Sequence, residues 1–304
     1  MRFNQLRDFL AVAERGSLRA ASRHLEIAQP TLTRSIQDLE RELGAELFER
    51  RAKGMSLTPT GEVLRRRAAT VTGEMRRIKE EIDQLRGDTH GHVTVCLSSV
   101  PHIALLPHAL TPFRLRYPDV HLEVFDSVFP SVEASLTDGS VDCYFGPAPA
   151  SVASSFVVEK LFDNTRVILC RRGHPLIGAR SLKELADARW LGTSITPRAE
   201  DELGPLFAQH GLPPPNLVMQ AHSALSFIVS AAYSDLLMML PIQWTEFELT
   251  RGLLQKIDVA EELPAPPICL ISRAGLPLTP AAEYFCDMMR RAAEEIVRTR
   301  KHKG

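Results

Sequence analysis

Apolar residues recur at helical spacing in the first two segments of the chain. Residues 3–15 repeat apolar side chains every three or four positions, which predicts an amphipathic helix that Gly16 ends. Ser17 is a suitable N-cap for a second helix at about 18–25, because its hydroxyl can accept from a free backbone N–H. The two alanines of this second helix would allow another helix to approach closely.

A third helix begins at Gln29 and carries a single apolar stripe. Pro30 suits its first turn because the missing N–H would have no partner there. The stripe recurs at spacings of four, three and four, and Gly44 closes the helix. Two short helices joined by a tight turn are typical of a helix-turn-helix. The next segment, LFERRAKGMSLT, predicts a strand–turn–strand wing with its turn at Lys53-Gly54.

Residues 60–86 have the pattern of one unbroken helix with a heptad repeat. The apolar positions alternate at spacings of four and three: Leu64, Ala68, Val71, Met75, Ile78, Ile82 and Leu85. A long helix with such a narrow seam must bury it against something. A partner helix from a second copy is the simplest solution, and packing against the chain's own core is the alternative. The segment 87–91, GDTHG, predicts a hinge.

Beyond residue 92 the pattern changes to short buried strands that alternate with helices. Apolar runs such as HVTVCLSS, HLEVFDS and VDCYFG predict strands, and the segments between them predict helices. This alternation implies a parallel, doubly wound sheet. It resumes beyond residue 160, and the chain ends in a helix at about 279–300. The strands are too many for one small sheet, so we expect two α/β lobes and an α/β fold class overall.

Composition and charge are compatible with DNA binding without proving it. The 304 residues are 44% hydrophobic and carry a formal net charge of −1. Residues 1–90 hold about 17 Lys and Arg against about 14 Asp and Glu, so this part is mildly basic and the rest mildly acidic. Charged residues interrupt the N-terminal apolar run, which argues against a signal peptide. We find no apolar run long enough to cross a membrane.

The five cysteines are widely scattered and form no Cys-x-x-Cys pair. Such a set suggests reduced thiols in a cytoplasmic protein. Most lie in apolar strand-like runs, so burial as small hydrophobic side chains is the simpler interpretation and a redox sensor is the alternative.

The segment GSLRAASRHLEIAQPTLTRSIQDLERELGAELFERRAKGMSLTPTGE resembles the LysR-type transcriptional regulators. The matching positions are Ser17, Ala20-Ala21, Leu25, Gln29-Pro30, Leu32, Ile36, Leu39-Glu40, Leu43-Gly44, Leu47-Phe48, Arg50, Leu57-Thr58 and Gly61. Two positions depart from the pattern, because Ala28 and Thr33 stand where the family often has serine. The resemblance spans about 45 residues here. It continues more loosely through LLPHALTPFRLRYPDVHLEV and the following Leu136, Gly139 and Asp142.

The resemblance implies a domain order and a set of partners. It gives a winged helix-turn-helix at 1–59, a dimerisation helix and hinge at 60–90, and an effector domain at 91–304 similar to periplasmic binding proteins. Lobe I would take about 91–163 and 266–304, and lobe II about 164–265. The implied partners are double-stranded DNA, a small-molecule effector, RNA polymerase, and further copies of the chain in a homodimer and homotetramer.

Candidate DNA contacts lie at the start of the third helix and on the wing. A recognition helix reads the major groove with its N-terminal residues, which here are Gln29, Pro30, Thr31, Thr33 and Arg34. Arginine can pair with guanine and glutamine with adenine, and threonine can contact a phosphate or a thymine methyl. The wing adds Arg50, Arg51 and Lys53 for phosphates or the minor groove. The alternative is an ordinary solvated helix.

Candidate effector contacts lie at strand ends, where ligands bind in such folds. They are Ser98, Ser99, Val100, Phe129, Gly146, Thr193, Ser194 and His222. Hydroxyls beside free N–H groups at a helix start favour an anion. Gly146 would allow a close approach. Phe129 could stack on an effector ring or belong to the core, and His222 could equally be a helix cap or a core histidine.

Three other functions compete with an effector-controlled regulator. An enzyme is disfavoured because the chain has no G-x-S-x-G, H-E-x-x-H, G-x-G-x-x-G or P-loop motif. A solute-binding protein would need export. A regulator with a vestigial effector cleft is the third option. We expect no metal and no cofactor. The expected mechanism is that effector binding re-angles the lobes and changes the DNA bend at a roughly palindromic site.

Overall fold

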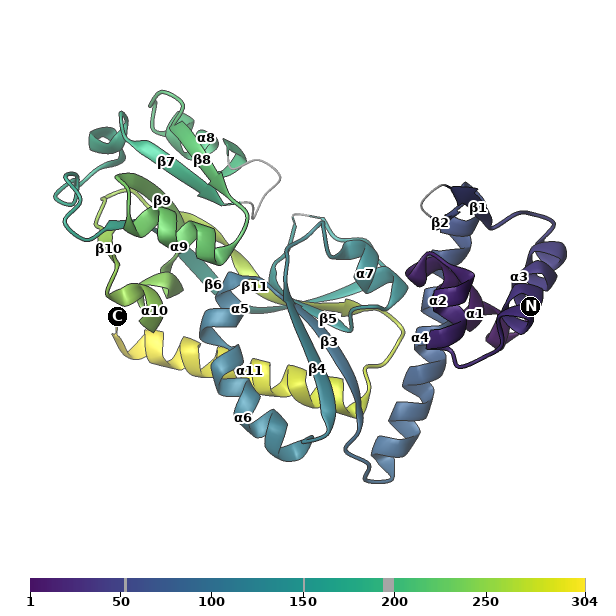
Figure 1. Ribbon diagram of the computed structural model, residues 1–304. Helices are drawn as coiled ribbons and strands as arrows, with labels where there is room; N and C mark the ends of the chain where they lie inside the picture. The colour runs from purple at the N-terminus through teal and green to yellow at the C-terminus, as the bar shows by residue number, and fades with distance from the viewer. Residues whose placement is uncertain (52–53, 150, 194–199, 304) are drawn as a thin grey trace.

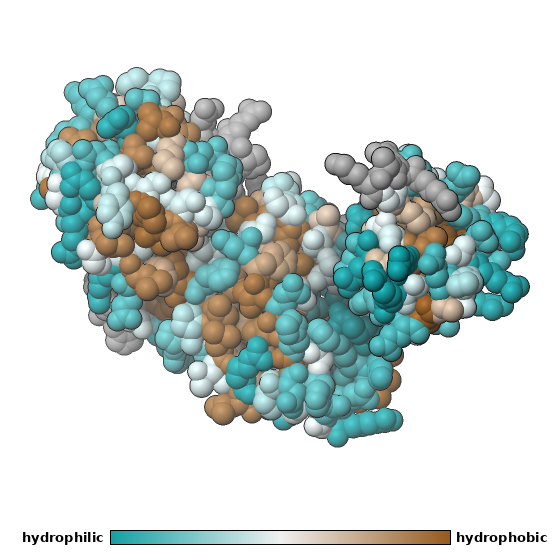
Figure 2. All heavy atoms as spheres, viewed as in Figure 1, coloured by the Kyte–Doolittle hydropathy of each residue, from teal (hydrophilic) through white to brown (hydrophobic). Residues whose placement is uncertain are grey.

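A computed structural model of the chain describes residues 1–51, 54–149, 151–193 and 200–303. The chain runs from a small N-terminal domain, through one long helix, into two α/β lobes that lie side by side (Figure 1). In the space-filling view, the N-terminal domain is covered mainly by hydrophilic residues, whereas hydrophobic residues gather over the two lobes (Figure 2). Each part has a hydrophobic core of its own.

The N-terminal domain is a three-helix unit with a two-stranded wing. Its elements are α1 (Phe3–Arg15), α2 (Leu18–His24), α3 (Gln29–Leu43), β1 (Phe48–Arg51) and β2 (Gly54–Leu57). Gly16 ends α1 in the left-handed conformation with φ of 64°, and Ser17 Oγ accepts from the Ala20 amide at 3.0 Å. These two adjacent residues stop one helix and start the next, as the sequence predicted.

The position of α3 is fixed by apolar packing and by one buried carboxylate. Phe9, Leu32 and Leu39 are fully buried in the domain core. Asp8 on α1 is also buried, and its Oδ2 accepts a 2.7 Å hydrogen bond from the Ser35 hydroxyl of α3. Arg7 pairs with the same carboxylate at 2.8 Å. The charge of Asp8 is therefore compensated, and the bond fixes how α3 is rotated against α1.

The wing is anchored to the end of α1. The Met55 amide donates to the Gly16 carbonyl at 2.9 Å. A Cβ at Gly54 would lie 2.7 Å from that carbonyl oxygen, and the φ of Gly54 is 129°. Glycine is therefore required where β2 begins, because both the backbone conformation and the close approach exclude a side chain.

The linker helix α4 (Pro59–Leu85) is the long helix that the heptad predicts. Thr58 caps it, with Oγ1 accepting from the Gly61 amide at 3.0 Å. Leu64 packs against the N-terminal core and Ala68 is fully buried in it, so the chain itself covers the start of the seam. The rest of the seam is exposed: Val71, Met75, Ile78, Ile82 and Leu85. The prediction of Ala68 as a dimer contact is therefore wrong for this protomer.

Lobe I is built on three parallel strands. Its elements are β3 (Gly91–Leu97), α5 (Ser99–Ala104), α6 (Leu106–Arg116), β4 (Val120–Asp126), α7 (Glu133–Asp138), β5 (Cys143–Pro147) and the C-terminal α11 (Pro280–Lys303). β3 pairs in parallel with both β4 and β5. One expected helix is broken into α5 and α6, because Pro107 has no N–H to continue the helical hydrogen bonds.

Lobe II repeats this plan. It contains η1 (Leu182–Leu185), β7 (Arg189–Thr193), α8 (Glu200–Gln209), β8 (Asn216–Ala221), α9 (Ala224–Ala232), β9 (Leu236–Pro241), η2 (Ile242–Thr245), α10 (Glu248–Arg251) and β10 (Leu254–Ile257). β7 pairs in parallel with β8 and β9. The segment η1 is a short 3-10 turn and not an α-helix.

Two long strands join the lobes. β6 (Phe156–Arg171) and β11 (Pro264–Arg273) run antiparallel to each other, and β11 shifts register between Ala265 and Cys269. β5 and β9 also pair antiparallel with these strands. The sheet is therefore mixed and not purely parallel as the sequence suggested, because the chain crosses between the lobes on strands.

Candidate functional sites: a DNA-binding face and an interlobe cavity

The outer face of α3 presents the predicted recognition residues together. Gln29, Pro30, Thr31 and Arg34 are exposed, and the Arg34 side chain is 85% exposed. Thr33 is half-buried, and its hydroxyl donates to the Gln29 carbonyl at 2.9 Å. Arg34 is therefore the side chain of this group best placed to reach a guanine edge.

One further residue of this face was missed by the sequence reasoning. Gln37 is exposed and, with Gln29, Pro30, Thr33, Arg34, Asp38 and Arg41, lines a shallow groove along α3. It lies one helical turn beyond Arg34, so the 3.6-residue period would have identified it. Asp38 holds Arg41 at 2.9 Å and lies 3.9 Å from Arg34, which keeps both arginines over the groove.

The wing residues are only partly described. The backbones of Arg50 and Arg51 lie in β1, paired with Met55 and Gly54. Lys53 falls outside the described residues. The wing follows α3 directly and is fixed to α1, so α3 and the wing are carried by the same small domain. This pairing of a helix with a wing is suited to contacting one groove and the neighbouring backbone.

A second site is a cavity of about 300 Å³ between the lobes. Lobe I contributes Ser98, Ser99, Val100, Phe129 and the Pro147–Pro149 segment, and lobe II contributes Met239 and Pro241. The connecting strands add Asn164 and Arg166 from β6 and Ala265, Pro266 and Ile268 from β11. The cavity therefore lies where the two lobes and both connecting strands meet.

Polar groups are few in this mainly apolar cavity. Ser98 is buried, and its Oγ has no hydrogen-bond partner. Asn164 is also buried, and its Oδ1 accepts from Gln243 Nε2 at 2.9 Å. Arg166 is half-buried, with Nη1 donating to the Pro264 carbonyl at 3.1 Å. Among the described lining residues Arg166 is the only charged one, and its guanidinium is a group from which an anion could accept a hydrogen bond.

Four of the predicted effector residues are brought together here: Ser98, Ser99, Val100 and Phe129. Phe129 also packs edge-on against Tyr144 and Phe156, with ring centroids 5.4 and 6.1 Å apart, so it is both a core residue and a cavity wall. Gly146 is adjacent to the cavity, but a Cβ there would overlap the Tyr144 hydroxyl. The lack of a side chain at Gly146 therefore makes room for Tyr144 and Ser98 of the protein itself, and not for a ligand.

His222 is not among the described residues that line this cavity. The backbone of Thr193 ends β7, and His222 is exposed directly after β8. Ser194 lies outside the described residues. Asn164 and Arg166 were missed by the sequence reasoning. The only signal was that two polar residues at alternate positions, on one face of the strand, precede the buried run VILC.

None of the described helices is both long and apolar enough to cross a membrane. No three His, Cys, Asp or Glu side chains within the described part of the chain are grouped so that they could hold a metal ion.

Comparison with known families assigns both sites to domains. Residues 3–62 match the bacterial regulatory helix-turn-helix protein of the lysR family, and residues 86–294 match the LysR substrate binding domain. The SDS degradation transcriptional activation protein of Pseudomonas sp. is 30% identical over 286 residues, covering 92% of each chain. The regulator GalR of Pseudomonas putida is 27% identical and covers 96% of this chain and 74% of its own.

Solved structures have the same fold. The LysR family regulator CbnR superposes with a TM-score of 0.71 at 21% identity, covering 96% of this chain and 99% of its own. CbnR in complex with its target DNA gives the same TM-score. Full-length OxyR from Pseudomonas aeruginosa gives 0.70 at 21% identity, covering 95% of each chain. This chain therefore belongs to the LysR family of DNA-binding transcriptional regulators, with an N-terminal helix-turn-helix and a two-lobed effector-binding domain.

Proposed function

We propose that this regulator responds to an amphiphilic monoanion bound in the interlobe cavity. The observation that carries the proposal is that the mainly apolar wall holds one charged residue among its described lining, Arg166, together with the unpartnered Ser98 hydroxyl. One guanidinium can neutralise one carboxylate or sulfate, and the surrounding Val, Pro, Phe and Met side chains favour an alkyl or aromatic body. A polyanion such as citrate would bury negative charges that have no cationic partner in the cavity, which is energetically costly.

A relative supports this choice of ligand class. The 30% identical Pseudomonas protein is named for transcriptional activation of SDS degradation. SDS is an alkyl sulfate, which combines a single negative charge with an apolar chain. The same combination matches the charge and the wall of the cavity in this chain. An alkyl or aryl carboxylate also combines one negative charge with an apolar body. We therefore propose the class of amphiphilic monoanions and not one compound.

The proposed output is a change in DNA geometry. The exposed seam on α4 would pair with a second copy, so that two α3 helices meet two half-sites of a roughly palindromic operator. Two such dimers, joined through their effector domains, would form a tetramer that bends the DNA and presents it to RNA polymerase. Bending a site of 20–30 base pairs by 40–90° costs about 1–6 kcal/mol, so a modest effector preference can shift the balance.

A thermal-shift series on the full chain tests the ligand class. Octyl sulfate and octanoate, both below their micellar range, are compared with octanol and citrate. A ligand at 100 times its Kd should stabilise the protein by about 2.7 kcal/mol. We expect stabilisation by the two amphiphilic anions only. Equal stabilisation by octanol, or by citrate alone, would refute the class.

A matched pair of variants tests the role of Arg166. Arg166→Gln should weaken octyl sulfate binding about 10–100-fold, the worth of a charge-assisted hydrogen bond of about 1.5–3 kcal/mol. Arg172→Gln is the control, because Arg172 is an exposed arginine directly after β6 and is not among the described residues of the cavity wall. If both variants bind as the wild type does, the anion is recognised elsewhere.

A further inference from the structure

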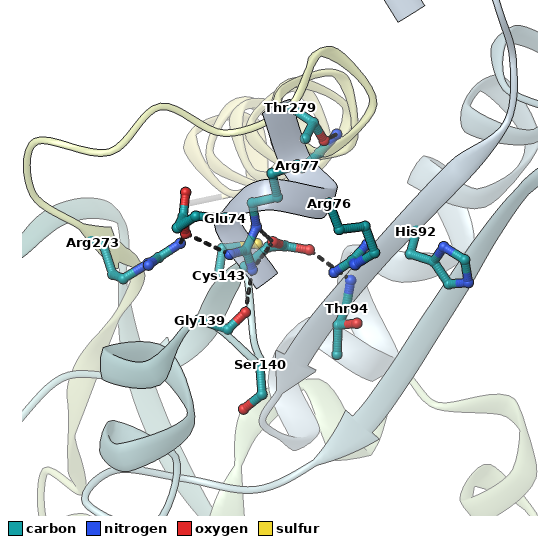
Figure 3. A network of polar contacts seen from close by, with 12 residues as sticks. Glu74, Arg76, Arg77, His92, Thr94, Gly139, Ser140, Cys143, Arg273 and Thr279 are labelled. Atoms are coloured by element: carbon teal, nitrogen blue, oxygen red, sulfur yellow. Dashed lines mark hydrogen bonds and ion pairs between the residues drawn. The ribbon is translucent and has the colours of Figure 1, made fainter. Parts of the chain in front are cut away.

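The linker helix α4 is held against lobe I by a buried arginine. Arg77 is only 5% exposed. Its Nε and Nη2 lie 3.0 and 2.9 Å from Asp142 Oδ1, and its Nη1 lies 2.7 Å from Glu74 Oε1 (Figure 3). Nη2 also donates to the Gly139 carbonyl. The guanidinium therefore bonds to α4 on one side and to lobe I on the other.

The partners of Arg77 form a closed, charge-balanced cluster. Arg273, at the end of β11, donates to Glu74 Oε1 at 2.7 Å, and the Thr94 amide of β3 donates to Asp142 Oδ2 at 2.8 Å. Two arginines thus face two carboxylates. Burial raises the pKa of Glu74, but the hydrogen bonds and charges of Arg273 and Arg77 outweigh it and hold the pKa below its ordinary value.

The surrounding backbone is shaped to admit these side chains. Gly139 has a φ of 78°, and a Cβ there would lie 2.8 Å from Arg77 Nη1 and 3.0 Å from Arg273 Nη1. Two turns further along α4, Gln84 makes a second contact. Gln84 Nε2 donates to the His90 carbonyl, and Gln84 Oε1 accepts from the Ala281 amide of α11, each at 3.0 Å. The helix is therefore fixed at two points along one face, and its apolar seam points elsewhere.

The same strands that meet Arg77 also reach the effector cavity. From Thr94, β3 leads to Ser98 directly after it; β11 runs back from Arg273 to Ile268; and β5 begins directly after Asp142 and leads to Pro147. Each path is four or five residues, or roughly 13–17 Å at the usual rise of a strand. A rearrangement of the cavity wall therefore acts on strands whose other ends hold the linker helix.

We propose that Arg77 is a positioning residue that latches the linker helix to lobe I and couples the orientation of that helix to the walls of the interlobe cavity. The inference rests on the proposed function in one respect, because it takes this cavity as the effector site. Buried ion pairs contribute little net stability compared with apolar packing, but they specify geometry. The latch fixes the direction of the exposed seam on α4, and with it the placement of the DNA-binding domain.

Hydrogen exchange on the full chain, without DNA or ligand, tests the coupling. Arg77→Gln removes the latch. The matched control is Arg76→Gln, because Arg76 is the neighbouring residue of α4, is 41% exposed and pairs only along the helix with Glu80. The diagnostic amides are those of Ser98–Val100, Val128 and Phe129, which form part of the cavity wall and do not contact Arg77. We expect Arg77→Gln to speed their exchange about tenfold, within the range of ordinary allosteric couplings.

The outcomes separate the possibilities. Faster exchange at the cavity wall in Arg77→Gln and unchanged exchange in Arg76→Gln support the latch. Faster exchange confined to α4 and to 139–143 would overturn it and leave the cluster a local structural feature. If Arg77→Gln does not fold, Asp142→Asn removes the charge of the lobe I partner while keeping its shape, and gives the same comparison. The exchange experiment is done without an effector. A negative result in the thermal-shift series would therefore be distinguishable from a negative result for the latch.

Discussion

Arg77 and Asp142 lie 65 residues apart in the sequence, yet two nitrogens of the guanidinium lie 2.9 and 3.0 Å from one carboxylate oxygen. Both side chains are buried. The pair crosses the boundary between the helix that carries the exposed seam and the lobe that forms half of the effector cavity. The way in which the two functional parts are joined therefore depends on this buried ion pair and its neighbours, together with the contacts of Gln84.

The first prediction concerns the stability of this junction. Replacing Arg77 by alanine leaves Asp142 buried without its cation, and breaking a buried pair in this way costs about 3–5 kcal/mol. Replacing Arg76 by alanine removes a partly exposed pair with Glu80 and should cost about 0–1 kcal/mol. Urea unfolding followed by circular dichroism measures both values. Equal, small losses would mean that Asp142 is compensated in another way.

The second prediction concerns acid. Burial raises the pKa of Glu74, but the hydrogen bonds and charges of Arg273 and Arg77 outweigh this effect. The pKa therefore lies below its ordinary value of 4.5. A group with a lowered folded pKa stabilises the fold above its unfolded pKa, and the stabilisation is lost as the pH falls through the folded value. Stability should therefore fall below about pH 4.5, and Glu74→Gln should reduce this slope. A slope identical to that of the wild type would contradict the pairing.

The third prediction addresses the redox alternative. All five cysteines are buried. Burial and the charge of Asp126 raise the pKa of Cys96 to about 12, and burial raises that of Cys170 to about 11. Because the thiolate is the reactive form, the native protein should react with a thiol reagent such as DTNB only as it unfolds. If one thiol reacts rapidly with DTNB under native conditions, a redox role for that cysteine would have to be considered again.

The fourth prediction concerns the start of α3. Ala28 occupies the N-cap and provides no side-chain hydrogen bond, whereas Ser17 and Thr58 cap the helices that follow them. Ala28→Ser should stabilise the DNA-binding domain by about 1 kcal/mol, because the hydroxyl can accept from the Thr31 amide. The thermal midpoint measures this change. Ala28→Val, which cannot cap, is the control, and an equal rise in both variants would exclude capping as the cause.

Much of the fold could be predicted from local patterns. Gly16, Ser17 and Gly44 mark helix ends, and the heptad marks α4, because these signals act between residues close in sequence. The buried stripe of α3 followed from its helical period, and the predicted DNA contacts followed from their position at the start of the helix. Such signals are local, so one sequence is enough to read them.

The junction and the cavity depend on contacts that local patterns do not encode. Arg273 and Glu74 are 199 residues apart, and nothing in the heptad distinguishes the buried Arg77 from the exposed Arg76. Arg166 enters the cavity wall only because β6 crosses between the lobes. The heptad placed Ala68 on the dimer seam for a related reason. The pattern shows that the side chain is buried, but it does not show that the chain's own N-terminal core buries it.

Selection of genomic fragments by the purified chain, at a stated salt near physiological, tests the central claim most directly. Wild type is compared with Arg34→Ala, since Arg34 is exposed on α3 and holds no part of the core. Because non-specific binding depends on salt, one fixed salt is essential. The account predicts a few roughly palindromic sites for the wild type and their loss or relaxation in the variant. Weak binding that is indifferent to sequence in both proteins would contradict it.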